Sequence, residues 1–420
     1  MPTIRIPYGD SEKRLEIADH RLLSMFDYPE IARPGPDREA ATVEAALAHP
    51  IAADPVAALA GPGKRVAILV DDWTRPTPAY KVLPILLRQL SAAGCSDEDI
   101  CITIAKGMHR PLSREEMVQK VGADVVARYA VANHDPHGDL VHLGTSPSGT
   151  PVFINQAVAE ADLRIAIGSI VAHPIAGFGG GAKIIVPGVA GHETIHNNHC
   201  LADHPNVTIG CVEGNPIRKD MEDIARLARL DMIVNTILSP GLEIIDAVAG
   251  DVVAAHREGV ARYRRLYGVT IGEQAEVGVV GASPRNGTFG HAVFALYAGA
   301  AMVRPGGSLI LVAPCSDGPG SKEGRRSFRQ QAAVPPEVLM ARVKSGEISA
   351  SGGAFMYVYA KTVSQYRVML VADNHSRSDA EDLGLGYGAT VQEALDSALA
   401  STSARASVMP SGGLAVPTPR

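Results

Sequence analysis

The stretch RVAILVDD, residues 65–72, decides how the chain folds. Its unbroken apolar run, which ends in two acidic residues, is typical of a strand buried inside a parallel sheet. YKVLPILLRQLSAAG (80–94) follows with helical spacing and completes a strand–helix unit. ICITIAKG (100–107) and DLRIAIGSIV (162–171) repeat the strand pattern. The sequence therefore predicts an α/β fold with mainly parallel sheets.

The rest of the chain continues this alternation. A helix and then a strand are predicted in GNPIRKDMEDIARLARLDMIVNTIL (214–238), and a long amphipathic helix in DVVAAHREGVARYRRLYG (251–268). New strands begin in AEVGVVGASP (275–284) and GGSLILVAPCSDG (306–318). We therefore expect two α/β domains, residues 1–268 and 269–420, and a terminal segment SGGLAVPTPR (411–420) without regular structure.

Composition narrows the classes of function. The 420 residues are 46% hydrophobic and 20% charged, and 39 basic against 45 acidic residues give a net charge of −6. Without a basic stripe, nucleic acid is not an expected partner. No apolar run reaches the roughly 18 residues of a membrane helix, and the first residues lack the apolar core of a signal peptide. We expect a cytoplasmic protein that makes no membrane contact. Its five cysteines form no CxxC pair, which argues against a zinc ribbon.

Each of the three predicted strands ends just before side chains that can do chemistry. Ligands bind beyond the carboxyl ends of parallel strands, so these side chains should share one crevice. Asp72, Thr74 and Arg75 lie on a turn stiffened by prolines, and the arginine fork suits a carboxylate or a phosphate. A salt bridge between Asp72 and Arg75 is the simpler interpretation of this turn. His109 and His173 follow the other two strands.

The third strand leads into HPIAGFGGGAKIIVPGVAGHETIHNNH, residues 173–199. Backbone amides of Gly179, Gly180 and Gly181, together with Lys183, suit a single phosphate or a carboxylate. A nucleoside-triphosphatase loop would need Ser or Thr after the lysine, where this chain has Ile184. A flexible turn is the alternative interpretation of the glycine run.

Three further histidines occupy helical spacing in the same stretch. If GHETIHNNH is a helix, His192, His196 and His199 share one face, as metal ligands often do. This arrangement would suit a zinc- or nickel-dependent hydrolase. The alternative is that these histidines only cap and hydrogen-bond neighbouring segments.

Several motifs together resemble one known family, the nickel-dependent lactate racemases and related 2-hydroxy-acid racemases. The resemblance runs through most of the chain and is carried by the DxTRP turn (72–76), the GxHR turn (107–110) and the HPxxGFGGGAKxxxPG block, with support from RIPYG, GNPIRKDMED and GDVVAAHREG. It implies an isomerase that uses nickel in a nickel-pincer nucleotide, pyridinium-3,5-bisthiocarboxylic acid mononucleotide. Dedicated biosynthetic enzymes would supply this cofactor. The first domain would bind the cofactor, and the second would close over the substrate.

The resemblance also implies a role for individual residues. Lys183 matches the lysine that can anchor the cofactor through a thioamide bond, and His199 matches the metal ligand. His109 and His173 match the acid/base pair, and Arg75 matches the residue that orients the substrate carboxylate. Cofactor contacts are implied for Asp72, Thr74, Arg75 and Gly179 to Gly181. Hydride would leave the α-carbon for the pyridinium ring and return to the other face, while the two histidines exchange the hydroxyl proton.

The second domain departs from the lactate racemase pattern. In SPRNGTFGHAVFAL (283–296), Gly290 and His291 stand where the family has a Tyr-Gln pair, and Phe294 replaces a lysine. We therefore expect a 2-hydroxy acid larger than lactate, with Arg285 and His291 as additional substrate contacts. Two alternatives stay open: the hydrolase, and a non-catalytic carrier of nickel or cofactor.

Overall fold

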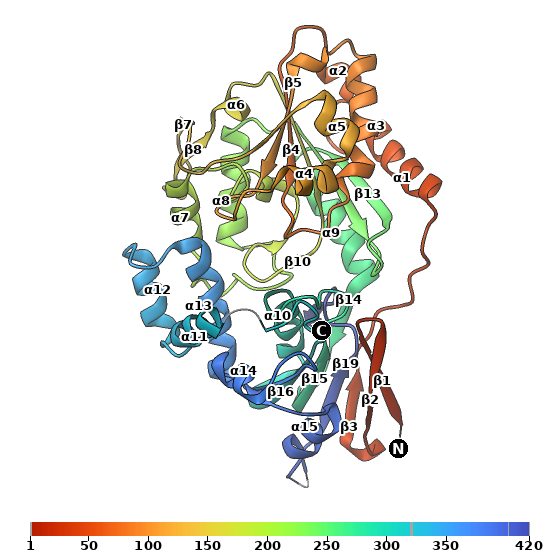
Figure 1. Cartoon of the computed structure of the whole chain (residues 1–420), viewed down its shortest axis with the longest axis vertical. Coiled ribbons are helices and arrows are strands. Elements are labelled where there is room, and N and C mark those ends of the chain that lie inside the picture. The colour runs from red at the N-terminus through yellow and green to blue at the C-terminus, as the bar shows by residue number, and fades with distance from the viewer. Residues whose placement is uncertain (1, 320–321, 402, 420) are drawn as a thin grey trace.

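Two six-stranded sheets form the framework of the computed structural model, which describes residues 2–319, 322–401 and 403–419. Figure 1 shows the two sheets in the upper and lower halves of the molecule, each with its own helices. This arrangement confirms the predicted α/β class with parallel sheets.

The first sheet has the strand order β13-β12-β9-β4-β5-β6. All neighbours in it are parallel except β12 and β13. The central strand β4 carries the apolar run quoted above, and residues 66–70 are completely buried because strands and helices cover both faces. The strand bounds are β4 Val66–Asp71, β5 Ile100–Ala105, β6 Ala130–Asn133, β9 Leu163–Ser169, β12 Met232–Leu238 and β13 Ile244–Gly250.

Helices and short hairpins surround this sheet. Two of the predicted helices, α8 and α9, form where their amphipathic patterns occur, and α8 begins with the Asn215 side chain accepting the Arg218 N–H and Pro216 in the first turn. The helices of this half are α1 Pro36–Ala48, α2 Val56–Leu59, α3 Ala79–Ala92, α4 Arg114–Val121, α5 Ala123–Arg128, α6 Gln156–Ala159, α7 His192–His199, α8 Pro216–Leu227 and α9 Ala254–Tyr267. The hairpin strands are β7 Leu140–Thr145, β8 Pro151–Asn155, β10 Ala172–His173 and β11 Gly177–Phe178.

The second sheet has the order β18-β17-β16-β15-β19-β3, and every pair of neighbours is parallel. Its strands are β3 Leu22–Met25, β15 Ala275–Gly281, β16 Val303–Val312, β17 Arg367–Val371, β18 Gly386–Tyr387 and β19 Ala406–Met409. Its helices are α10 Phe289–Ala300, α11 Lys322–Ala332, α12 Pro336–Lys344, α13 Ala350–Gln365, α14 Arg377–Asp382 and α15 Val391–Ala398.

The start of the chain differs from the predicted domain ranges. Residues 1–25 were expected in the first domain, yet β3 is an edge strand of the second sheet. The antiparallel strands β1 (Thr3–Tyr8) and β2 (Ser11–Glu16) bury Ile4 and Ile6 in the same core as Val277 and Val279 of β15. Figure 1 shows both strands beside the lower sheet. The division at residue 268 itself stays a prediction.

The predicted irregular C-terminus was wrong. Strand β20 (Val416–Pro419) pairs in parallel with β14 (Gly268–Ile271), the segment that directly follows α9. Leu414, Ala415 and Val416 are buried, so removal of apolar surface from water fixes this end of the chain.

No helix in the described residues is long and apolar enough to cross a membrane. The cytoplasmic location stays a prediction.

Candidate functional site

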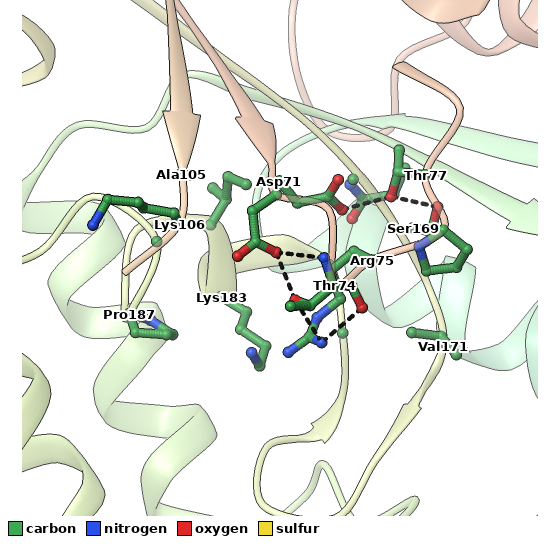
Figure 2. Close-up of a pocket in the computed structure, with 18 of the residues that line it drawn as sticks. Asp71, Thr74, Arg75, Thr77, Ala105, Lys106, Ser169, Val171, Lys183 and Pro187 are labelled. Carbon is green, nitrogen blue, oxygen red and sulfur yellow. Dashed lines mark hydrogen bonds between the residues drawn. The ribbon is translucent and has the colours of Figure 1, made fainter. Parts of the chain in front are cut away.

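A cavity opens beyond the carboxyl ends of β4, β5, β9 and β12, between the sheet and the segment that follows β9. Its volume is about 590 Å³ when the open solvent at its mouth is included. All the residues predicted to contact a cofactor line it, and so does His109; Figure 2 shows Thr74, Arg75 and Lys183 among the lining side chains. The complete lining is Asp71, Asp72, Thr74–Thr77, Ala105, Lys106, His109, Gly168, Ser169, Val171, Gly179–Gly181, Lys183, Ile184, Pro187, Gly188 and Asn235.

The turn after β4 presents an aspartate–histidine pair. Asp72 Oδ2 lies 2.5 Å from His109 Nδ1, while Oδ1 accepts hydrogen bonds from the Thr74 hydroxyl at 2.5 Å and the Thr74 N–H at 3.1 Å. Burial by itself would raise the pKa of Asp72, but the hydrogen bonds from His109 and Thr74 lower it to about 2. An ionised carboxylate accepts the Nδ1–H of His109, which leaves Nε2 free to take a proton.

Arg75 does not form the predicted alternative salt bridge with Asp72. Its guanidinium instead donates to the carbonyl and hydroxyl oxygens of Thr74, both at 3.2 Å, as Figure 2 shows. Most of the guanidinium donors are therefore available to a bound anion.

A row of buried polar groups supports the same turn, and sequence reasoning missed it. Lys120 forms an ion pair with Asp71 (Nζ–Oδ1 2.6 Å) and donates to the carbonyl of Arg75 at 3.0 Å. Thr77 donates to the other Asp71 oxygen at 2.5 Å and contacts the Ser169 hydroxyl at 2.8 Å. The only sequence signal was Asp71, the first of the two aspartates that end RVAILVDD. Because these groups are hydrogen-bonded away from water, they hold the turn in one conformation.

The glycine run forms a cradle, and side chains from β12, α8 and α9 hydrogen-bond to its backbone. Gly180 and Gly181 have φ angles of 72° and 59°, which favour glycine, and a Cβ at Gly181 would lie 2.7 Å from the His256 ring. Asn235 Oδ1 accepts the Gly181 N–H at 2.8 Å. Arg218, completely buried in α8, donates to the carbonyls of Ala176 and Gly180, each at 3.2 Å, and also to that of Phe178. These contacts tie up the loop carbonyls from one side, and the glycine residues line the cavity on the other.

Two titratable groups at the loop, Lys183 and His173, have pKa values well below their ordinary values. Burial, followed by the charges of Arg75 and Arg218, lowers the pKa of Lys183 well below its ordinary value. Burial and then Lys183 and Arg75 also lower the pKa of His173. Lys183 Nζ has no hydrogen bond or ion pair within the described part of the chain. Lys183 lines the cavity beside the positive charges that lower its pKa, and such a surplus of positive charge is suited to receive an anion.

His173 and His199 are not among the residues that line this cavity. His173 Nδ1 accepts the N–H groups of Ile175 and Ala176, both at 3.2 Å, so only Nε2 is available for proton exchange. His199 ends α7 with a buried Nδ1 that has no hydrogen-bond partner, and burial, followed by Lys183, lowers its pKa to about 4. Its imidazole is therefore neutral at physiological pH, which is the form that binds metals.

The predicted helix over GHETIHNNH forms, but a three-histidine metal centre does not. Within the described ranges, no group of three or more His, Cys, Asp or Glu side chains could hold a metal ion. His192 stacks against His137 with ring centroids 5.3 Å apart, and His196 Nε2 lies 3.5 Å from the Cys200 sulfur. The ligand set expected for a hydrolase is thus absent from this part of the structure.

A second cavity adjoins the first and lies between the two halves of the chain; its volume is about 790 Å³ when the open solvent at its mouth is included. Thr74, Arg75 and Pro76 line both cavities. The predicted substrate contacts Arg285 and His291 line the second cavity from the turn after β15 and the start of α10. Phe294 lies behind them, with its ring 4.0 Å from the Arg285 guanidinium and 5.8 Å from the His173 ring. The structure thus brings the residues of the two halves together around Arg75.

Comparison with known proteins assigns both halves of the chain. Residues 8–210 match the lactate racemase N-terminal domain, and residues 276–416 match the lactate racemase C-terminal domain. The chain is 32% identical to the lactate racemase of Lactiplantibacillus plantarum, over 98% of this chain and 99% of the relative. It is 30% identical to the lactate racemase of Thermoanaerobacterium thermosaccharolyticum, over 98% of both.

Solved structures give the same result for the fold. The lactate racemase apoprotein from Thermoanaerobacterium thermosaccharolyticum superposes with a TM-score of 0.89 and 29% identity, covering 99% of this chain and 100% of that one. A protein from Thermotoga maritima, at 18% identity and a TM-score of 0.66, shares the fold over 94% of this chain and 100% of its own.

Proposed function

This chain belongs to the lactate racemase family and is an isomerase, and from that premise we propose that it racemises or epimerises a 2-hydroxy acid larger than lactate. The proposal includes a nickel-pincer nucleotide, supplied by other enzymes, that exchanges hydride with the substrate. The observation that carries it is the Asp72–His109 pair in one cavity with Arg75 and Lys183. A base, a carboxylate-binding group and an unpaired amine are the parts that this chemistry needs.

The residues present fit the cofactor. Among the described residues Lys183 Nζ has no partner, and its depressed pKa favours the neutral amine that forms covalent bonds. The buried imidazole of His199, which its lowered pKa keeps neutral, is a suitable nickel ligand. Asp72, Thr74, Arg75 and the glycine cradle would contact the rest of the nucleotide. When bound, the pyridinium ring supplies a hydride acceptor that later acts as a hydride donor.

The chain itself handles the proton. We propose that His109 Nε2 takes the proton of the substrate hydroxyl group, while Asp72 keeps the Nδ1–H in place and balances the charge that develops on the imidazole. His173 exchanges the proton on the opposite side through Nε2, the ring nitrogen that its backbone contacts leave free. Two histidines are needed because the hydroxyl group points in opposite directions in the two enantiomers.

Arg75 is proposed to hold the carboxylate of the substrate while the planar keto acid rotates to present its other face. The support from Lys120 and Asp71 fixes the main chain of the turn that carries Arg75. A carboxylate held at one end keeps the keto acid from escaping during the rotation.

The lining of the second cavity extends from Arg75 to Arg285 and His291, and this extent supports a substrate larger than lactate. Gly290, at the start of α10, is exposed and is not among the residues that line this cavity. His291 faces this cavity and is proposed to contact polar groups beyond the α-carbon. We expect lactate to be a poorer substrate than longer acids by about 10²-fold in kcat/KM.

The test uses protein produced together with the enzymes that make the cofactor. Loss of optical rotation is followed for lactate and for a panel of longer 2-hydroxy acids, with His291→Ala measured beside the wild type. The proposal on substrate size fails if lactate has the highest kcat/KM, or if His291→Ala leaves the ranking of substrates unchanged.

A second arm tests the cofactor. The same chain from a host without the cofactor-making enzymes should be inactive even when nickel salts are added, and mass spectrometry should detect no nucleotide on it. Racemisation by nickel-soaked protein that carries no nucleotide would contradict the pincer proposal.

A further inference from the structure

The second cavity combines two arginines with a complete lack of acidic groups. Arg75 enters from the turn after β4, and Arg285 enters from the turn after β15. None of the residues described as lining the cavity is Asp or Glu. Its wall therefore carries two arginine charges and no carboxylate of its own, although Asp72 lies close enough to Arg75 for their charges to interact.

Arg285 is held in position without a counterion. Its guanidinium stacks on the Phe294 ring at 4.0 Å, and its Nη1 donates to the Ala172 carbonyl at 3.4 Å. Within residues 2–319, 322–401 and 403–419, no carboxylate forms an ion pair with it. Burial, with help from Arg75, lowers the pKa of Arg285 to about 10, so the group still carries its charge at neutral pH. The Phe294 ring and the Ala172 carbonyl stabilise this cation in part, and a ligand that brings a negative charge would stabilise it further.

The two arginine charges of this cavity indicate how many anionic groups its ligand carries. One carboxylate on the substrate satisfies Arg75 under the proposed function, and Arg285 then remains unpaired in the same cavity. We propose that the substrate is a 2-hydroxy acid with a second anionic group, and that Arg285 binds this group from the second half of the chain. This inference rests on the proposed function and names the substrate class. The two arginines belong to different halves of the chain, so such a substrate bridges both sides of the cavity.

The experiment compares substrates that differ in one charge. Malate is paired with its 4-amide, and 2-hydroxyglutarate with 2-hydroxypentanoate, on the holoenzyme. We expect the dianions to be favoured by about 10²-fold in kcat/KM, and Arg285→Met to abolish this preference. Arg285→Lys, which keeps the charge, should restore part of the preference.

A matched control removes another arginine that lies over an aromatic ring. Arg264 lies over Phe178 at 5.5 Å and does not line the second cavity. Arg264→Met should keep the preference for dianions. If Arg285→Met lowers kcat/KM for monoanions and dianions equally, both arginines hold a single carboxylate and the inference is overturned. A wild-type preference for the monoanionic partners also overturns it.

Binding separates this inference from the proposed function. Calorimetric titration of the full chain with 2-hydroxyglutarate, and with 2-hydroxypentanoate for comparison, needs no turnover. Dianion binding that disappears in Arg285→Met would support the inference even if no acid were racemised, and the proposed function alone would then fail. Racemisation of monoanions, together with no tighter binding of the dianion, would overturn the inference and leave the proposed function intact.

Discussion

The substitution Asp72→Asn tests the proposed base most directly. It keeps the size of the side chain and replaces the charged carboxylate that accepts the His109 Nδ1–H by a neutral amide. An amide can present its N–H₂ group to Nδ1, which would reverse the tautomer of His109 and leave a proton on Nε2. We therefore expect His109 to lose its function as a base.

The size of the effect follows from the pKa of Asp72. Its fall from 3.8 to about 2 corresponds to about 2 kcal/mol of net stabilisation of the carboxylate, which is 98% buried. Loss of this interaction weakens the base by on the order of 30-fold, and the wrong tautomer adds to this. We expect kcat/KM for racemisation to fall by about 10²- to 10³-fold.

The assay follows racemisation of the preferred acid by holoenzyme, with the amount of bound cofactor measured in each preparation. Glu116→Gln is the matched control, because it also removes a carboxylate, but from an exposed pair with Arg110, the residue that follows His109 in the chain. This control should retain activity within about 2-fold. If Asp72→Asn with full cofactor content retains activity within 3-fold, Asp72 does not control the proton on His109.

The same substitution should also change how the free energy of unfolding depends on pH. Asp72 has a lower pKa in the folded chain than in the unfolded chain, so its contribution is complete above about pH 4 and disappears as the pH falls toward 2. The free energy of unfolding of the wild type should therefore exceed that of Asp72→Asn by about 2 kcal/mol at neutral pH, and the difference should shrink across this window. Urea denaturation at several pH values measures it, and a constant difference would contradict the lowered pKa.

The remaining predictions concern the histidines and the loop clamp, by which we mean Arg218 and its hydrogen bonds to the carbonyls of the glycine run. His109→Ala and His173→Ala should each reduce racemisation in both directions by at least about 10²-fold, measured from each pure enantiomer; normal activity in either variant would remove that histidine from the mechanism. His192→Ala and His196→Ala should change it by less than about 5-fold while nickel content stays constant, and loss of nickel in either would overturn the choice of metal ligand. Arg218→Met leaves three loop carbonyls without their donor, so the free energy of unfolding should fall by about 3 kcal/mol or more and cofactor content should drop. Unchanged denaturation and cofactor content in that variant would show that the clamp is dispensable.

The candidate site could be predicted in large part because its residues follow local patterns. An apolar run such as residues 65–72 identifies a buried strand, and parallel strands end at the same edge of a sheet. Those two facts were sufficient to expect Asp72 and His109 in one crevice. The spacing of Lys183 and the glycine run lies within a single short segment, so it too could be recognised without the fold.

The tertiary structure decided what no local pattern contains. Arg218 and His256 belong to helices with ordinary amphipathic patterns, and only long-range packing brings them under the glycine cradle. Chain order placed residues 1–25 with the first sheet, but strand pairing depends on which edge is open, and β3 pairs with β19. Arg75 and Arg285 are 210 positions apart in the printed sequence, so their shared cavity exists only after the two halves pack together. The sequence shows which residue types occur and at what spacing. Whether a charged side chain in a cavity has a partner depends on every element that surrounds the cavity.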